Sequence, residues 1–300
     1  MTEHYPRLRV HARNGRLIVR EGLHICFYMR QPHAAVAPHV LHALEVFHEA
    51  AGTNAFGRYA DSEGDWHILD ASGWQHVRDE LQADDWAVVR LQSAPHEESL
   101  HAFEYHGKDL EAVAEESPGA VTALGFWLPT ERLEEWGPQR VRELALNLAR
   151  PLPFCSGHAG LAFNGELDLV GVEQQTDAWR CRYPGLDIID LHGLSWKLGT
   201  RLRGPSWLTF LGQPVLGELN GAMALQSRLN AADTTVQSLD EGRAVVTLGE
   251  RPEAGDTDQG NRLPAYRELA RVLEPWTYRE EHLRGLGAEA RRRWERRFLD

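Results

Sequence analysis

The stretch Leu17-Ile-Val-Arg-Glu-Gly-Leu-His-Ile-Cys-Phe-Tyr-Met29 decides how this chain can fold. Near its end, residues 25–28 place apolar side chains at successive positions, which is typical of a strand buried on both faces. The pair Asn14-Gly15 precedes the stretch and tolerates the positive φ angles of a tight turn. The sequence therefore predicts an antiparallel hairpin of residues 8–12 with Leu17–Met29, in which the second strand is central.

Outward from this strand, apolar residues recur at helical spacing. Leu44, Phe47 and Ala51 belong to a stripe that predicts a helix over His33–Ala51, which Gly52 ends. Further strands are expected at residues 86–91, 100–105, 120–128 and 244–248, and further helices at 70–81, 130–148, 219–230 and 263–273. The polar stretches 57–70 and 250–262 are expected to be loops.

The order of these elements indicates the fold class. Strands often follow one another directly instead of alternating with helices, so the fold is expected to be α+β, with mixed or antiparallel sheets and packed helices. Pro151 and Pro153 stop the preceding helix and mark the best internal boundary. We expect an N-terminal α+β lobe over residues 1–150 and a C-terminal α+β lobe over residues 151–300. Together they form one contiguous unit, either one large domain or two abutting lobes.

Composition excludes several classes of protein. At 300 residues and 42% hydrophobic side chains, the chain is long enough to bury a substantial core. Its longest uncharged stretches fall short of the roughly 20 apolar residues of a membrane-spanning helix. The N-terminus is charged where a signal peptide needs an apolar run, so we expect a cytoplasmic protein with no membrane partner. Cys26, Cys155 and Cys181 lack CxxC spacing and are odd in number, which predicts buried reduced thiols rather than disulfides or a thiolate metal site.

Negative charge is concentrated in one segment. Residues 41–120 hold 17 acidic and four basic side chains, a net charge of −13, whereas the whole chain carries −12. Such a field repels phosphate backbones and speeds encounter with a basic partner, so direct nucleic-acid binding is not expected. The same acids could also serve only to keep the surface soluble. The arginine-rich C-terminus spaces Trp294 and Phe298 as a helix packed on the body would, which we favour over a nucleic-acid-binding tail.

Motifs for catalysis are absent from the sequence. Cys155 and His158 are only three residues apart in a Gly-containing stretch that is expected to turn, and Ser156 lacks the GxSxG elbow. No P-loop or dinucleotide-binding motif is present. We therefore expect no catalytic residues, no cofactor and no enzymatic activity.

Histidine spacing argues against a metal site. Twelve of the 15 histidines precede residue 107. On the expected first helix His39 and His42 share a face, but His48 does not, so the three cannot converge without a distant partner. Four acids between residues 61 and 70 lack the EF-hand pattern, and a solvated loop anchored by two tryptophans explains them better. We expect no metal; whether the histidine-rich half binds one with a ligand from elsewhere stays open.

Five segments stand out by their order and joint presence. They are Gly22-Leu-His-Ile-Cys-Phe-Tyr-Met-Arg30, Gly57-Arg-Tyr-Ala-Asp-Ser-Glu-Gly-Asp-Trp66, Ser156-Gly-His-Ala-Gly-Leu-Ala-Phe163, Tyr183-Pro-Gly-Leu-Asp187 and Gly204-Pro-Ser-Trp-Leu-Thr209. Together they resemble the TsiV-like family of bacterial type VI secretion immunity proteins. The resemblance implies an antidote that binds and blocks a cognate antibacterial effector, and some relatives are paired with nuclease toxins. The family supplies no catalytic residue to carry over.

The acidic segment offers a surface for such an effector, which an adjacent gene would encode. A nuclease presents a basic cleft to its substrate, and carboxylates can occupy that cleft in place of phosphates and so occlude it. Aromatic side chains supply the buried area of an interface. The expected contact residues are Asp61, Glu63, Asp65, Trp66, Tyr59 and Trp74. Trp86 is instead expected to pack in the core. Two alternatives stay open, a small-molecule-modifying enzyme and a scaffold or adaptor protein.

Overall fold

The computed structural model describes residues 4–94, 101–167, 169, 171–279 and 293–300. The first half contains strands β1 (Val10–His11), β2 (Leu17–Met29), β3 (Arg58–Ala60), β4 (Trp66–Ile68), β5 (Ala87–Gln92), β6 (Ala102–Gly107) and β7 (Thr122–Pro129), and helices α1 (His33–Ala51), α2 (Ala71–Leu81), α3 (Thr130–Trp136) and α4 (Pro138–Ala149). The second half contains strands β8 (Phe154–Gly165), β9 (Asp187–Ile188), β10 (Leu208–Leu211), β11 (Thr234–Ser238) and β12 (Ala244–Leu248). Its helices are α5 (Val172–Arg182), α6 (Leu191–Lys197), α7 (Val215–Glu218), α8 (Gly221–Gln226) and α9 (Pro264–Leu273), with short 3₁₀ turns η1 (Thr257–Gln259) and η2 (Glu274–Trp276).

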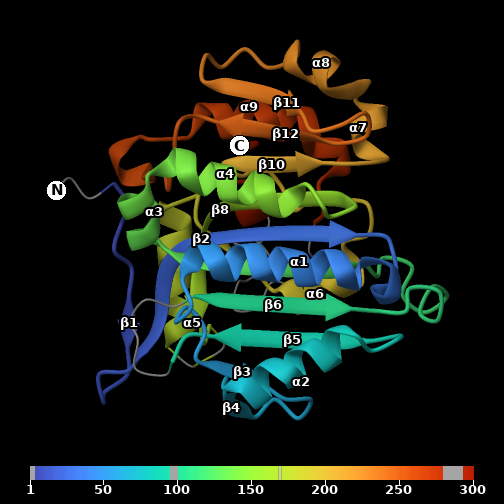
Figure 1. Cartoon of the computed structure of the whole chain (residues 1–300). Coiled ribbons are helices and arrows are strands. Elements are labelled where there is room, and N and C mark those ends of the chain that lie inside the picture. Colours follow the sequence, from blue (N-terminus) through green and yellow to red (C-terminus); the bar gives the residue numbers. More distant parts are fainter. Residues whose placement is uncertain (1–3, 95–100, 168, 170, 280–292) are drawn as a thin grey trace.

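Within the described residues, the strands of both halves join one sheet. Its order is β11-β12-β10-β8-β2-β7-β6-β5-β3-β4, with β1 beside β2 and β9 beside β8 (Figure 1). Paired strands run antiparallel except that β9 is parallel to β8. The expected α+β class and the central position of β2 are confirmed. The division of one contiguous unit into an N-terminal lobe over residues 1–150 and a C-terminal lobe over residues 151–300 stays a prediction.

Strand β2 is buried on both faces. Leu23, Ile25 and Phe27 belong to the main core, together with side chains from α1 and α4 that cover this face of the sheet (Figure 1). Cys26 and Tyr28 point to the opposite face, where side chains of α6 cover them. We call the face covered by α1 and α4 the core face, and the face covered by α6 the α6 face. The successive apolar residues of β2 are explained, because each alternate side chain meets a different layer.

Two helices expected as continuous are divided or shortened in the structure. The helix expected over 130–148 is divided into α3 and α4 by Gly137, which has a φ of +78°, and Pro138 then occupies the first position of α4. The helix expected over 219–230 is shortened to α8, because Asn220 and Gly221 have positive φ at its start and separate it from α7, which ends at Glu218. The apolar residues still recur at helical spacing in the sequence, because each of the short helices α3, α4 and α8 buries at least one apolar side chain.

Other local expectations were partly wrong. The stretch 57–70, expected as a loop, forms the β3–β4 hairpin. Residues 156–163, expected to turn, lie inside the long strand β8, where β2 pairs with them throughout. The two aromatic anchors of the C-terminal region, Trp294 and Phe298, are buried as expected. Residues 280–292, in which most of the expected C-terminal helix falls, lie outside the described residues.

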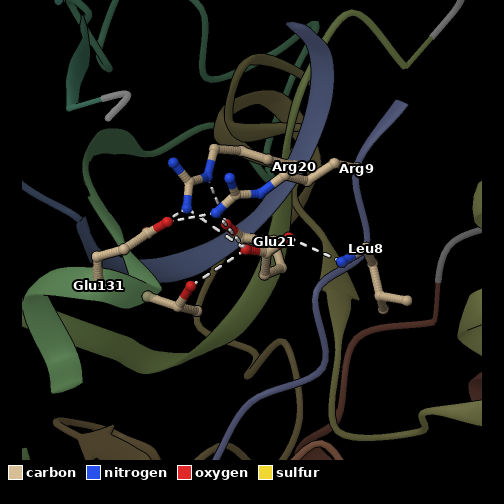
Figure 2. Close-up of polar contacts among 6 residues, drawn as sticks. Leu8, Arg9, Arg20, Glu21 and Glu131 are labelled. Carbon is tan, nitrogen blue, oxygen red and sulfur yellow. Dashed lines mark hydrogen bonds and ion pairs between the residues drawn. The ribbon is translucent and has the colours of Figure 1, made fainter. Parts of the chain in front are cut away.

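A buried ionic network ties three segments together at one end of β2 (Figure 2). The Glu21 carboxylate accepts hydrogen bonds from the Leu8 amide at 2.9 Å and the Thr130 hydroxyl at 3.2 Å. It also pairs with Arg9 at 3.3 Å, and both Arg9 and Arg20 pair with Glu131 of α3. The side chains of Arg20 and Glu21 are almost wholly buried, so both charges lose their hydration on folding. The ion pairs and hydrogen bonds compensate for that loss.

We expect Glu21→Gln to destabilise the protein by about 3 kcal/mol, because it leaves the buried Arg20 guanidinium with less compensating charge. The matched control is Glu135→Gln, which removes the exposed Arg132–Glu135 pair on α3 and should cost about 0.5 kcal/mol or less. Chemical denaturation of the two variants measures the difference. Equal losses of unfolding free energy would contradict a structural role for the buried network.

Candidate partner-binding surface

Within the part of the chain that the structure describes, the α6 face of the outer strands is uncovered. Along β5, Ala87, Val89 and Leu91 are buried on the core face, whereas Val88 is exposed on the opposite face. Ala60 of β3 pairs with Arg90 of β5 on one side and with Trp66 of β4 on the other. Side chains of directly paired residues point to the same face of a sheet, so Trp66 shares the exposed face with Arg90. Strand β4 forms this edge of the sheet (Figure 1).

Four large apolar side chains are exposed here. Trp66, Ile68, Trp86 and Val88 are exposed by 38%, 80%, 42% and 45%, and we call these four residues the open sheet face. Trp86 contacts Trp196 of α6 with ring centroids 6.0 Å apart, so the open sheet face begins where α6 ends. Exposed apolar area of this kind is typical of a surface that binds another molecule.

Trp86 and Trp66 differ from their sequence-based predictions. Trp86 was expected in a core strand, but it precedes β5 and is exposed, because no element among the described residues covers the α6 face at this point. Trp66 lies in strand β4 instead of a loop, with the Arg58 guanidinium 4.5 Å from the centre of its ring. Ile68 was not selected from the sequence, although strand alternation from Trp66 would have placed it on the same face.

The acidic turn between β3 and β4 lies beside the open sheet face. The Asp61 carboxylate accepts hydrogen bonds from the amides of Glu63 at 3.0 Å and Asp65 at 2.9 Å. It also contacts His67 Nε2 at 2.7 Å, and this hydrogen bond is the main reason that the pKa of Asp61 is lowered. Asp61 therefore shapes the turn, whereas the side chains of Glu63 and Asp65 are exposed to a partner.

A second group of acids lies at the same end of these strands. Asp84 and Asp85 are exposed immediately before Trp86, and the Glu80 carboxylate accepts a hydrogen bond from the Val88 amide at 3.0 Å. The register of β3 on β5 directs the acidic turn toward this end. Apolar contact area and negative charge are thus adjacent in the structure.

Tyr59 and Trp74 lie behind the open sheet face. Tyr59 packs against the core on the opposite side of β3, with its ring 5.0 Å from that of His76. Trp74 of α2 packs beside His48 of α1 at 4.9 Å between ring centroids. Both rings are half-buried, so the structure brings Trp66 and the acids together at one surface and places these two aromatics beneath it.

Cys155 with His158 and Ser195 with Lys108 are candidate nucleophile arrangements for catalysis, and both are buried. Burial raises the pKa of the Cys155 thiol to about 11, which keeps it protonated, and its sulfur contacts the backbone carbonyls of Tyr28 at 3.2 Å and Gly199 at 3.7 Å. Lys108 Nζ lies 2.7 Å from Ser195 Oγ, and burial lowers the pKa of this lysine to about 8. Ser195 is fully buried and its hydroxyl donates to the His192 carbonyl, so a substrate has no access to it.

These features define an α+β protein built on one open sheet, with an uncovered apolar sheet face flanked by acids. The sequence matches the family TsiV, type VI immunity for VRR-NUC, over residues 39–298. The chain belongs to this family, as its sequence resemblance implied. Among the described residues, none of the helices is both long enough and apolar enough to cross a membrane.

One solved structure extends the likeness to nearly the whole chain. The Pseudomonas aeruginosa T6SS protein PA0821 is similar with a TM-score of 0.79, covering 97% of this chain and 87% of that chain at 19% sequence identity. At this identity the likeness shows the shared fold. No curated protein matches the sequence significantly.

We expect Trp86→Ala to lower the free energy of unfolding by about 2 kcal/mol, because 42% of the side chain is already exposed and only the remainder loses buried area. The matched control is Trp207→Ala, which removes a fully buried tryptophan and should cost about 3–5 kcal/mol. Urea denaturation of both variants tests this. A loss as large for Trp86→Ala as for Trp207→Ala would place Trp86 in the core.

Proposed function

We propose that this chain is a cytoplasmic immunity protein that binds and neutralises a VRR-NUC effector of a type VI secretion system, encoded by an adjacent gene. Membership of the TsiV family supports the class of partner. The observation that points to the surface is the juxtaposition of the open sheet face with the acidic turn. The protein would act by occlusion of the effector's substrate-binding surface, without chemistry of its own.

The physical argument rests on complementary charge and desolvation. A nuclease must hold a polyanion, so its substrate surface is basic, and exposed carboxylates such as Glu63 and Asp65 match it in sign. Charges at an interface mainly speed association and fix orientation. Trp66 and Ile68 beside them supply apolar area that loses water on binding, which slows dissociation. The two groups therefore predict separable kinetic effects.

Neutralising the free acids should slow association. The double variant Glu63→Gln/Asp65→Asn keeps Asp61, which shapes the turn, and should reduce the association rate with the effector by roughly threefold to tenfold at low salt. The difference should shrink at high salt because ions screen exposed charges. Stopped-flow or surface-based kinetics at two salt concentrations measures both effects.

The control for charge is Asp233→Asn/Glu241→Gln, two exposed acids beside β11 at the opposite end of the sheet order. This control variant should leave the association rate unchanged at both salt concentrations. If the two double variants slow association equally, the acids act through net charge and the acidic turn is not the docking site.

Truncating the central aromatic should speed dissociation. Trp66→Ala should weaken effector binding by about 30-fold, which corresponds to about 2 kcal/mol, with little change in association. Met223→Ala, which removes a highly exposed apolar side chain from α8, is the control and should bind like the unchanged protein. Cells that express the effector should lose protection with Trp66→Ala and keep it with Met223→Ala.

Two outcomes contradict different parts of the proposal. Normal binding by a folded variant that lacks Trp66, Glu63 and Asp65 would remove this surface as the interface. Failure of the unchanged protein to bind or neutralise any neighbouring effector would remove the immunity function itself.

A further inference from the structure

Three potential metal ligands meet on the α6 face of the sheet. His24 and Cys26 are two residues apart on β2 and so share a face, and the register places His158 of β8 directly opposite Cys26. All three side chains are buried, and one potential ligand atom from each lies within 4.8 Å of the other two. Residues 132 positions apart in the sequence thus form one cluster.

The cluster has polar atoms that the protein itself does not satisfy. His158 Nε2 is buried and has no hydrogen-bond partner among the described residues. Cys26 Sγ lies 3.3 Å from Nδ1 and 3.2 Å from Nε2 of His24. The two ring nitrogens point in different directions, so one sulfur cannot make a linear hydrogen bond to both. A buried polar atom without a partner requires an explanation, and coordination of an ion is one that also fits its neighbours.

Neighbouring residues make room for the His24 ring and fix its orientation. Gly125 of β7 faces Cys26, and a Cβ atom there would lie 2.6 Å from His24 Nε2. Gly160 pairs with His24 on β8 and adds no side chain beside it. The imidazole stacks on Trp127, with ring centroids 4.2 Å apart and planes 14° apart. The ring is therefore held against the Cys26 sulfur by its surroundings.

We propose that His24, Cys26 and His158 bind a zinc ion that links β2 to β8. Imidazole nitrogen and thiolate sulfur are the ligands that zinc prefers. With usual bond lengths, ligand atoms around tetrahedral zinc lie about 3.5 Å apart, and the ligand atoms of this cluster lie within 4.8 Å of one another. Three protein ligands leave a fourth position for water. The ion would join the first half of the chain to the second at the centre of the sheet.

The charges around the cluster indicate which ligand must supply negative charge to the ion. Zinc binds imidazole in its neutral form, and the rings of His24 and His158 are both buried away from water. The nearby carboxylate of Asp187, which is 13% exposed, is paired with Arg203 at 3.0 Å and Arg297 at 3.5 Å. The positive charges of these guanidinium groups repel a bound cation. The negative charge of the Cys26 thiolate must offset that repulsion. Binding therefore releases the Cys26 proton to solvent.

The three cysteines provide a matched set of variants. The full chain is produced in zinc-supplemented medium without chelators, and its zinc content is measured by elemental analysis. The unchanged protein, Cys155→Ser and Cys181→Ser should each hold about one zinc ion per chain. Cys155 is a buried thiol outside the cluster and Cys181 is an exposed one, so they control for burial and for surface binding. Cys26→Ser and His158→Asn should lose the ion, with affinity reduced by more than about 100-fold.

Cobalt(II) tests the site even if the ligand variants fold poorly. The unchanged protein is unfolded and refolded with cobalt, which should produce the intense sulfur-to-cobalt absorption of a thiolate ligand. Persistence of that absorption in both Cys155→Ser and Cys181→Ser assigns it to Cys26. Absence of metal after both zinc supplementation and cobalt refolding would overturn the proposal. Loss of the absorption in Cys155→Ser or Cys181→Ser would likewise overturn the proposal.

Discussion

Burial of β2 on both faces and along both edges is the constraint on which the other elements depend. Its backbone pairs with β7 and β8, which come from different halves of the chain. Helices α1 and α4 must cover one face and α6 the other, because apolar side chains occupy both. Arg20 and Glu21 lie within this strand, so the N-terminal segment and α3 are drawn in to neutralise them.

Coverage of the α6 face ends before the outer strands, and the candidate function follows from that. The short helix α6 reaches Trp86 through Trp196, while β3, β4 and the exposed face of β5 extend beyond it. An uncovered sheet face of this kind is costly for a protein that acts alone and useful for one that binds a partner. In a member of the TsiV family, the acids beside this face have the sign that a nuclease partner would attract.

Local signals in the sequence predicted single elements well and their surroundings poorly. The helix His33–Ala51 has the expected bounds, because its apolar stripe and the terminal glycine act within the segment itself. The burial of Trp86 was misjudged, because a strand pattern identifies two faces without saying which has a covering layer. Among the acids, Asp61 and Glu63 look alike in the sequence, and only the folded turn shows that Asp61 is engaged by backbone amides.

The sequence by itself determined the α+β class, the central strand, the concentration of negative charge and the absence of a catalytic motif. These properties depend on composition and on spacing within short segments. Only the tertiary structure decided that Trp66, Ile68 and Trp86 share an open face, and that His158 faces Cys26 across two strands. The reason is strand register, since a shift of one residue exchanges the two faces of a strand, and pairing between distant strands sets that register.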